Sequence, residues 1–388
     1  MDTSSPTKMQ ALLEQGQSVW LDYLHRRLTR SGELQTLIDR GLRGMTSNPT
    51  IFEQAIGGSA DYADELAELA SSSKTDREVF ETLAIQDVRE AADLFQPVYR
   101  ATGGADGFVS LEVSPGVAHD TDGSVNEARR LWKAVDRPNA MIKIPGTREG
   151  WPAIERCLQE GININITLLF SVDHYQQVAE AYMRALEKRL AAGQSIDRIS
   201  SVASFFVSRV DTEVDRRIQA KGGSLLSLQG KVAIAGARLA YAMFEKMTRS
   251  ARWRALEAQG AQRQRLLWAS VGTKNPGYSD VMYVESLIGH DTVATIPPDT
   301  LARFEDHGRV SDALGVGTAR DARRVMDALA TGWIDFADVN RTLEAEGIEK
   351  FAKSFQELLG TIAQRRRLAG RETAAAGVAR LSVQGRDS

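Results

Sequence analysis

Residues 162–170 read ININITLLF, and aliphatic and polar side chains alternate along this stretch. Successive side chains of a β-strand point to opposite faces, so one face carries Asn165 and Thr167. The other face is aliphatic and consists of Ile162, Ile164, Ile166 and Leu168. In a closed sheet the aliphatic face is covered by helices, and the polar face turns inward. The stretch therefore predicts a barrel strand with Asn165 and Thr167 in the lumen.

Similar short runs recur along the chain and are separated by segments with helical periodicity. The predicted strands are 18–24, 44–48, 107–114, 139–144, 162–170, 199–207, 265–271 and 291–296. Strands that alternate with helices indicate a parallel α/β sheet, and eight of them favour a (β/α)8 TIM barrel. A flavodoxin-like open sheet is the alternative, but eight similar strands favour closure.

The chain is longer than such a barrel, which typically needs about 250 residues. The excess fits additional helices inserted at 57–103 and 208–262 and a helical C-terminal extension after residue 310. We expect one barrel domain over 1–370 and a disordered tail over 371–388. Two capping boxes, at Thr75–Glu78 and Ser124–Glu127, predict helix starts.

Composition argues against several classes of protein. Lysine and arginine total 48 against 51 aspartates and glutamates, a balance that indicates neither a nucleic-acid binder nor an anionic-membrane binder. The single cysteine, Cys157, allows no intramolecular disulfide. The N-terminal stretch MDTSSPTKMQALLEQGQ contains no apolar h-region, and no run in the sequence approaches the length of a membrane span. We expect a cytoplasmic protein, either a monomer or a homodimer.

One lysine stands inside a run that reads as a buried strand, "NAMIKI" at 139–144. Lysine is rarely buried without a partner. Strand alternation points Lys143 into the lumen, and the same test on "GFVSLEVS" points Ser110, Glu112 and Ser114 inward. Other polar residues lie late in their strands, namely Asp22, Asn48, Ser204 and Ser270. These side chains should converge at the C-terminal mouth, where barrels of this type carry their active sites.

The chemistry of this set centres on Lys143. Burial disfavours an ammonium and lowers the pKa of a lysine, and a neutral amine attacks a carbonyl to form a Schiff base. Glu112 and Asp22 are suited to acid/base work beside such an amine. The alternative is a purely structural ion pair between Lys143 and one of these carboxylates.

Metal and nucleotide cofactors find no support in the sequence. The five histidines are scattered, and neither an HExxH motif nor a Cys/His cluster is present. No GxGxxG motif follows a strand, and no glycine-rich phosphate cup for pyridoxal phosphate lies near Lys143. A substrate phosphate needs cationic donors, and Arg209 and Lys274 follow predicted strands six and seven. Phosphate sites of such barrels often lie after strands seven and eight, which also favours Ser270.

Six segments in order resemble the transaldolases, and most closely the longer bacterial type, from about Ser18 to beyond Pro297. These segments are GMTSNPTIF, SLEVSP, IKIPGT, NINITLLFS, SFFVSRVD and WASVGTKNPGYSD. The resemblance implies a class I aldolase-like barrel with no metal or organic cofactor and with a Schiff-base lysine on the fourth strand. Lys143 lies on the fourth predicted strand.

The resemblance also implies a role for each matching residue. Lys143 would attack the C2 ketone of a ketose phosphate, such as fructose 6-phosphate or sedoheptulose 7-phosphate. Asp22 would take the C4 hydroxyl proton, and Glu112 and Thr167 would hold a water that relays protons. The enamine would then add to erythrose 4-phosphate or glyceraldehyde 3-phosphate, which completes a dihydroxyacetone transfer.

The remaining matches would bind the substrate. Hydroxyls of the three-carbon unit would contact Asn48, Asn165 and Ser204, and the phosphate would contact Arg209, Ser270 and Lys274. Two positions depart from the shorter transaldolases: Lys274 stands where many have an arginine, and Phe205 where they have a proline. Lysine is a point charge without the bidentate fork of arginine.

Two other functions compete with transfer. The first is an aldolase that releases free dihydroxyacetone, an activity that shares the lysine but usually sits on a shorter chain and uses a tyrosine. Keeping both Asp22 and Glu112 favours transfer. The second is a catalytically silent barrel used for binding, against which the buried charged set argues.

Overall fold

The computed structural model describes residues 6–70 and 72–384. Parallel strands pair in sequence order and close into one barrel, β1-β2-β3-β4-β5-β6-β7-β8, so the open-sheet alternative is excluded. The strands are β1 Gln17–Asp22, β2 Leu42–Thr46, β3 Phe108–Glu112, β4 Ala140–Pro145, β5 Ile164–Leu169, β6 Ser201–Phe206, β7 Arg265–Ala269 and β8 Thr292–Ile296. Each predicted strand is present at its expected place. The predicted (β/α)8 TIM barrel is confirmed.

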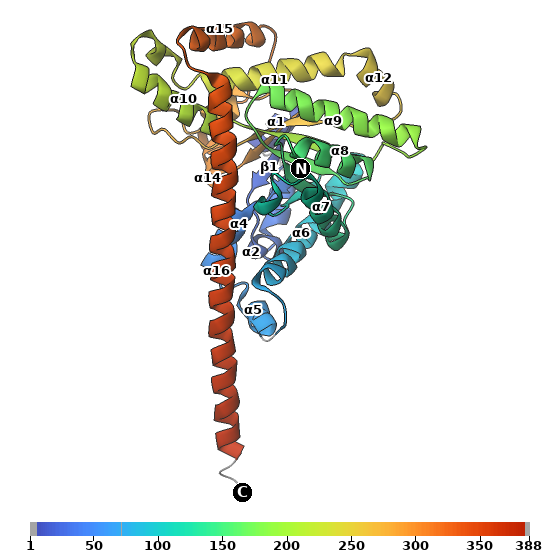
Figure 1. The fold of residues 1–388 in the computed structure, drawn as a ribbon, viewed down its shortest axis with the longest axis vertical. Helices are drawn as coiled ribbons and strands as arrows, with labels where there is room; N and C mark the ends of the chain where they lie inside the picture. Colours follow the sequence, from blue (N-terminus) through green and yellow to red (C-terminus); the bar gives the residue numbers. More distant parts are fainter. Residues whose placement is uncertain (1–5, 71, 385–388) are drawn as a thin grey trace.

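Helices surround the barrel, with the longest one on its flank (Figure 1). They are α1 Lys8–Glu14, α2 Arg26–Arg30, α3 Glu33–Asp39, α4 Pro49–Gly58, α5 Ala63–Ala70, α6 Asp76–Ala101, α7 Thr121–Val135, α8 Gly150–Gln159, α9 Val172–Ala191, α10 Ser208–Lys221, α11 Val232–Thr248, α12 Ala251–Glu257, α13 Met282–Ser286, α14 Pro298–His307, α15 Thr318–Thr331 and α16 Phe336–Gln384. Two 3₁₀ turns, Pro115–Val117 and Gly223–Leu228, complete the set. Helices fill both predicted insertions and the C-terminal extension.

The register of the central strands confirms the alternation read from the sequence. Glu112 on β3 pairs with Lys143 on β4, and Lys143 pairs with Asn165 on β5. The three side chains therefore share one row inside the barrel. The alternation ends at Thr167, because the β5–β6 register shifts beyond Ile166 and Leu168 has a left-handed backbone with φ +59°. The sequence placed Leu168 on the regular aliphatic face, and this irregularity corrects that prediction.

The two predicted capping boxes have different outcomes. Thr75 and Glu78 form the box that opens α6. The box at Ser124 is wrong, because α7 already begins at Thr121, where the Asp120 side chain accepts a hydrogen bond from the Gly123 amide. Glu127 accepts a hydrogen bond from the Ser114 amide instead of closing a box.

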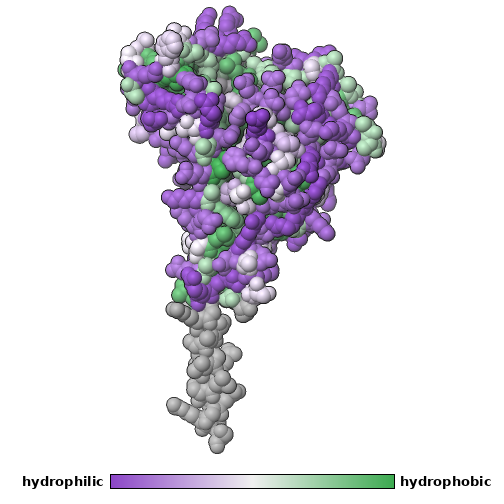
Figure 2. Space-filling view, in the orientation of Figure 1, coloured by the Kyte–Doolittle hydropathy of each residue, from purple (hydrophilic) through white to green (hydrophobic). Residues whose placement is uncertain are grey.

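The C-terminal helix α16 runs along the whole length of the barrel and projects past it (Figure 1). It packs on α4, α5, α6 and α10. Apolar side chains on the face shown in Figure 2 gather along the line of α16, while most of that face is hydrophilic. Polar contacts add to this packing, including Arg217 with Asp338 at 2.7 Å and Arg366 with Asp76 at 2.6 Å. The helix is therefore fixed to the barrel at both ends of its packed part.

The helix continues to Gln384, past residue 371, where the sequence predicted a disordered tail to begin. The alanines at 374–376 favour this continuation, because alanine has the highest helix propensity. The last part of the expected tail, 385–388, lies outside the described residues.

Candidate active site

Lys143 lies buried in the lumen beside a carboxylate. Its Nζ is 3.4 Å from Glu112 Oε2 and donates a hydrogen bond to the Ser47 carbonyl at 3.3 Å. Only about a twentieth of either side chain is exposed, at 6% and 5%. Lys143 and Glu112 thus form the ion pair that the sequence analysis gave as the alternative to a catalytic lysine. The surrounding residues show whether a substrate can also reach Lys143.

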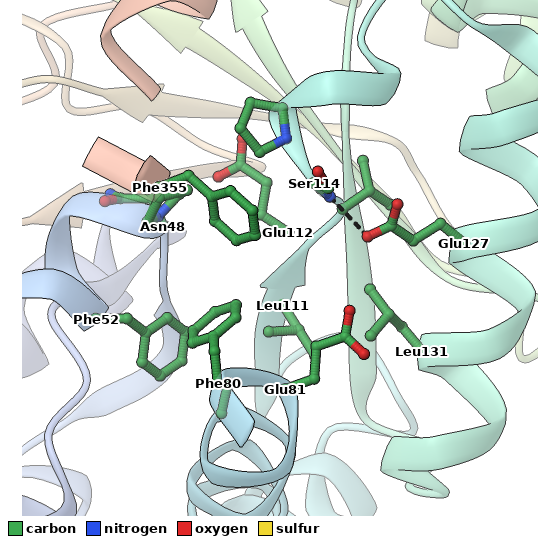
Figure 3. Close-up of a pocket in the computed structure, with 14 residues that line it drawn as sticks. Asn48, Phe52, Phe80, Glu81, Leu111, Glu112, Ser114, Glu127, Leu131 and Phe355 are labelled. Atoms are coloured by element: carbon green, nitrogen blue, oxygen red, sulfur yellow. Dashed lines mark hydrogen bonds between the residues drawn. The ribbon is translucent and has the colours of Figure 1, made fainter. Parts of the chain in front are cut away.

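An apolar wall lies behind Glu112. Figure 3 shows the ring of Phe355 beside Glu112, with Phe80 and Phe52 farther along the same wall. The three rings stack edge to face with centroids 5.4 Å and 5.6 Å apart, and they come from α16, α6 and α4. Burial raises the pKa of Glu112, while the charges of Lys143 and Arg209 oppose this shift. The wall therefore makes Glu112 a better proton acceptor than an exposed glutamate.

Asp22 stands at the end of β1 and is oriented by threonines. Thr46 Oγ1 lies 2.8 Å from Asp22 Oδ1 and equally 2.8 Å from Thr295 Oγ1. Thr46 donates to the carboxylate, which leaves the hydroxyl of Thr295 to donate to Thr46. Strands β1, β2 and β8 thus fix the carboxylate of Asp22 at the lumen wall.

Amide and hydroxyl groups form a second chain across the lumen floor. Ser204 Oγ donates to Asn165 Oδ1 at 2.7 Å, and Asn165 Nδ2 donates to Ser110 Oγ at 3.0 Å. Phe205, at the position that departs from the shorter relatives, points away and packs on Trp268 with centroids 6.2 Å apart. The departure at Phe205 therefore leaves Ser204 in the lumen.

Two buried oxygens near Lys143 accept no hydrogen bond from the described residues, although one of them, Glu112 Oε2, forms the ion pair with Lys143. Among the described residues, no hydrogen-bond partner reaches Glu112 Oε2 or Thr167 Oγ1. Buried polar atoms are normally satisfied, and those left without a protein partner in a site are suited to hold water or substrate. Both belong to residues that the sequence predicted to act together.

Asn48 lines the cavity and also caps a helix. Its Oδ1 accepts a hydrogen bond from the Ile51 amide at 3.0 Å and caps α4. This bond fixes the side chain and leaves its Nδ2 as a donor. The neighbouring Ser47 donates to the Ser110 carbonyl at 2.6 Å, which ties the end of β2 to β3.

The cationic residues lie at the other side of the mouth. Arg209, on the first turn of α10, packs against Phe206 with its guanidinium 5.0 Å from the ring centroid. Burial lowers the pKa of Arg209. Ser270 follows β7 in a left-handed conformation, φ +56°, and its Oγ is 2.9 Å from Ser208 Oγ. Lys274 lies farther along the same loop, which follows β7.

A cavity of about 220 Å³ joins these groups. The predicted residues that line it are Asp22, Asn48, Lys143, Thr167, Ser204, Arg209, Ser270 and Lys274. Glu112 and Asn165 do not line it but contact its lining directly, through Lys143 and Ser204. The structure thus brings every predicted site residue to one place.

Several residues that line the cavity were not predicted from the sequence. Thr46 and Thr295 also line the cavity, and Thr46 could have been found because it precedes Asn48 by two positions. Lys350 and Phe351 come from α16. No local pattern marks these two residues, because they lie on a long amphipathic helix whose docking site depends on the tertiary fold.

Two further properties of the described residues bear on function. None of their helices is both long and apolar enough to cross a bilayer. Their His, Cys, Asp and Glu side chains form no group of three arranged to hold a metal ion.

Comparisons with known proteins agree with this geometry. A family model described as Transaldolase/Fructose-6-phosphate aldolase matches residues 19–362. A transaldolase of Saccharopolyspora erythraea is 49% identical over 363 residues, which cover 93% of this chain and 98% of that protein. A transaldolase of Acidothermus cellulolyticus is 48% identical, covering 92% and 96%, and one of Trichodesmium erythraeum is 46% identical, covering 90% and 95%. The chain belongs to the transaldolase/fructose-6-phosphate aldolase family.

Proposed function

We propose that this protein is a transaldolase that transfers a dihydroxyacetone unit between sugar phosphates through a Schiff base on Lys143. The observation that carries the proposal is a cavity lined by the buried Lys143, by Asp22 and by cationic side chains, with Glu112 directly beside the Lys143 amine. Relatives named transaldolase support the reaction class. The enzyme would act in the cytoplasm, in the non-oxidative pentose phosphate pathway, as a monomer or homodimer.

The first half of the reaction breaks a carbon–carbon bond. A proton passing from Lys143 to Glu112 gives the neutral amine, which adds to the C2 ketone of the ketose phosphate and loses water to form the imine. Asp22 removes the C4 hydroxyl proton, the C3–C4 bond breaks, and its electrons move into the imine to give an enamine. The aldose phosphate then leaves with its new aldehyde.

The second half reverses these steps on another acceptor. The enamine carbon attacks the aldehyde of erythrose 4-phosphate or glyceraldehyde 3-phosphate, and Asp22 returns its proton to the new C4 oxygen. Water held between Glu112 and Thr167 then hydrolyses the imine. Glu112 Oε2 and Thr167 Oγ1 accept or donate no hydrogen bond among the described residues, which supports this role.

Residues around the lysine would hold the sugar and its phosphate. Asn165 and Ser204 present amide and hydroxyl groups to the three-carbon unit, as does Asn48 from its helix cap. The phosphate would lie between Arg209, Ser270 and Lys274, which line the cationic side of the cavity.

The family also includes aldolases that release free dihydroxyacetone, so the acceptor decides between the two activities. The cavity lining among the described residues contains Asp22 and no tyrosine, which favours transfer. The test is to follow fructose 6-phosphate consumption with and without erythrose 4-phosphate. Transfer predicts sedoheptulose 7-phosphate only when the acceptor is present, and cleavage at the same rate without acceptor would overturn the transferase assignment.

A further inference from the structure

The long helix α16 contributes a third cation to the proposed phosphate site. Lys350 lines the same cavity as Arg209 and Lys274, although it belongs to a helix far from the barrel strands in sequence. Within the described part of the chain, no ion pair or hydrogen bond occupies any of these three side chains. Arg209 lies deepest, and the two lysines stand at the exposed rim of the cavity.

Lys350 lies near enough to the other two cations for their charges to act on it. The pKa of Lys350 is lowered by partial burial and by the charges of Arg209 and Lys274. The charges of Asp22, Glu112 and Glu346 act favourably on Arg209, but none of these carboxylates forms an ion pair with it within the described residues. Like charges gathered without a direct ion-pair partner are stabilised by a bound anion, and a phosphate dianion accepts hydrogen bonds from several cations at once.

The fit of α16 onto the site is close and specific. Gly347 lies against β5: a Cβ at this position would stand 2.9 Å from Leu168 Cδ2 and 3.5 Å from Arg209 Nη1. One turn later the Phe351 ring centroid is 5.6 Å from the Arg209 guanidinium, opposite Phe206 at 5.0 Å. Arg209 is therefore held between two aromatic rings, one of which α16 supplies.

We propose that Lys350 is a phosphate-binding residue and that α16 forms the phosphate end of the substrate site. The inference rests on the proposed function, because it takes the substrate to be a sugar phosphate. It means that the C-terminal extension, absent from a minimal barrel, selects phosphorylated over unphosphorylated sugars. A third cation also compensates for Lys274, which lacks the bidentate fork of arginine.

The experiment compares Lys350→Met, Lys350→Arg and the control Lys353→Met in the full chain. Lys353 lies one turn farther along α16, is exposed, and is 4.0 Å from Glu357. Two quantities are measured for each protein: the KM for fructose 6-phosphate in the transfer assay and the inhibition constant of inorganic phosphate. A third is borohydride trapping of Lys143 by free dihydroxyacetone, which carries no phosphate.

Lys350→Met should raise the KM for fructose 6-phosphate and the inhibition constant of phosphate roughly 3- to 10-fold. This loss lies between that expected for an exposed ion pair and that expected for a charge-assisted hydrogen bond. Lys350→Arg should restore most of the affinity, Lys353→Met should match the wild type, and trapping by dihydroxyacetone should stay unchanged in all variants. Unchanged constants in Lys350→Met, with normal trapping, would overturn the assignment of Lys350 alone. Absence of trapping in the wild type would instead overturn the Schiff-base function.

Discussion

At the residue scale, the chemistry depends on how two carboxylates are divided around one lysine. Glu112 contacts Lys143 directly and is backed by the aromatic wall, whereas Asp22 is held by Thr46 on the cavity surface. We propose that these environments give the two acids separate tasks. Glu112 would serve the nitrogen, where the imine forms and hydrolyses, and Asp22 would serve the C4 oxygen of the substrate.

Asp22→Asn tests this division. Asparagine keeps an oxygen for the Thr46 hydroxyl but does not remove the C4 proton, so transfer should fall by about 10²- to 10⁴-fold. The imine should still form, because Glu112 and Lys143 are unchanged. Borohydride followed by mass analysis should reveal a six-carbon adduct from fructose 6-phosphate on Lys143, in place of the three-carbon adduct of the wild type. A three-carbon adduct on the variant would show that Asp22 is not the residue that promotes cleavage.

At the scale of elements, α16 connects the C-terminal extension to the catalytic mouth. It provides Phe355 to the wall behind Glu112, and Lys350 and Phe351 to the cationic side of the cavity. Thr50 of α4 donates a hydrogen bond to Ser354 at 2.8 Å, which fixes the helix beside the cap residue Asn48. One helix thus supports both ends of the site.

Gly347→Leu should separate α16 from the mouth. The new side chain would overlap Leu168 and press on Arg209, and overpacking of this kind typically costs about 1–3 kcal/mol. We expect a lower Tm and a higher KM for fructose 6-phosphate. Gly360→Leu is the matched control, because a Cβ there meets nothing within 4 Å and leucine has the higher helix propensity. Equal kinetics in the two variants would contradict the close approach at Gly347.

At the scale of the whole molecule, different polar contacts are found at the two ends of the barrel. The end opposite the site is closed by Arg265, which contacts Ser18 at 2.7 Å and Asp106 at 3.1 Å, while the Trp20 indole donates to Asp106 at 2.9 Å. The catalytic end is bordered instead by the loop of Lys274, which Asp211 and Asp215 on α10 anchor through Tyr283 and Tyr278.

Asp211 should make the stability of the protein depend on pH. Burial raises the pKa of its carboxyl to about 6, above its ordinary value, so the folded state retains the proton more strongly than the unfolded state. The contribution of Asp211 to the free energy of unfolding therefore falls by on the order of 2 to 3 kcal/mol as pH rises from about 4 to about 6. Above about pH 6 this contribution is constant.

Asp211→Asn removes this dependence because asparagine does not titrate. Urea unfolding at several pH values between 4 and 7 should show that the stability of the wild type falls relative to that of the variant across this range. Any constant cost of the substitution, such as a reoriented Tyr283 hydroxyl, cancels in the comparison. Parallel curves for the two proteins would mean that Asp211 titrates normally.

The barrel and its inward residues were predictable because they follow from local patterns. Strand alternation alone pointed Lys143, Glu112 and Asn165 into the lumen, where the register places them in one row, and it failed only where β5 becomes irregular at Leu168. Lys350 was not predictable, since a lysine on an amphipathic helix resembles any solvated lysine until the helix docks. The start of α7 was missed because Asp120 competes successfully with Ser124 as the cap.

The central claim, that Lys143 forms a Schiff base, is tested most directly by borohydride reduction in the presence of fructose 6-phosphate, followed by peptide mass analysis. We predict a reduced three-carbon adduct on Lys143, its absence in Lys143→Met, and cooperative thermal unfolding of that variant, which shows that it is folded. A folded wild-type protein that consumes fructose 6-phosphate in the presence of acceptor, yet carries no adduct on Lys143, would contradict the account.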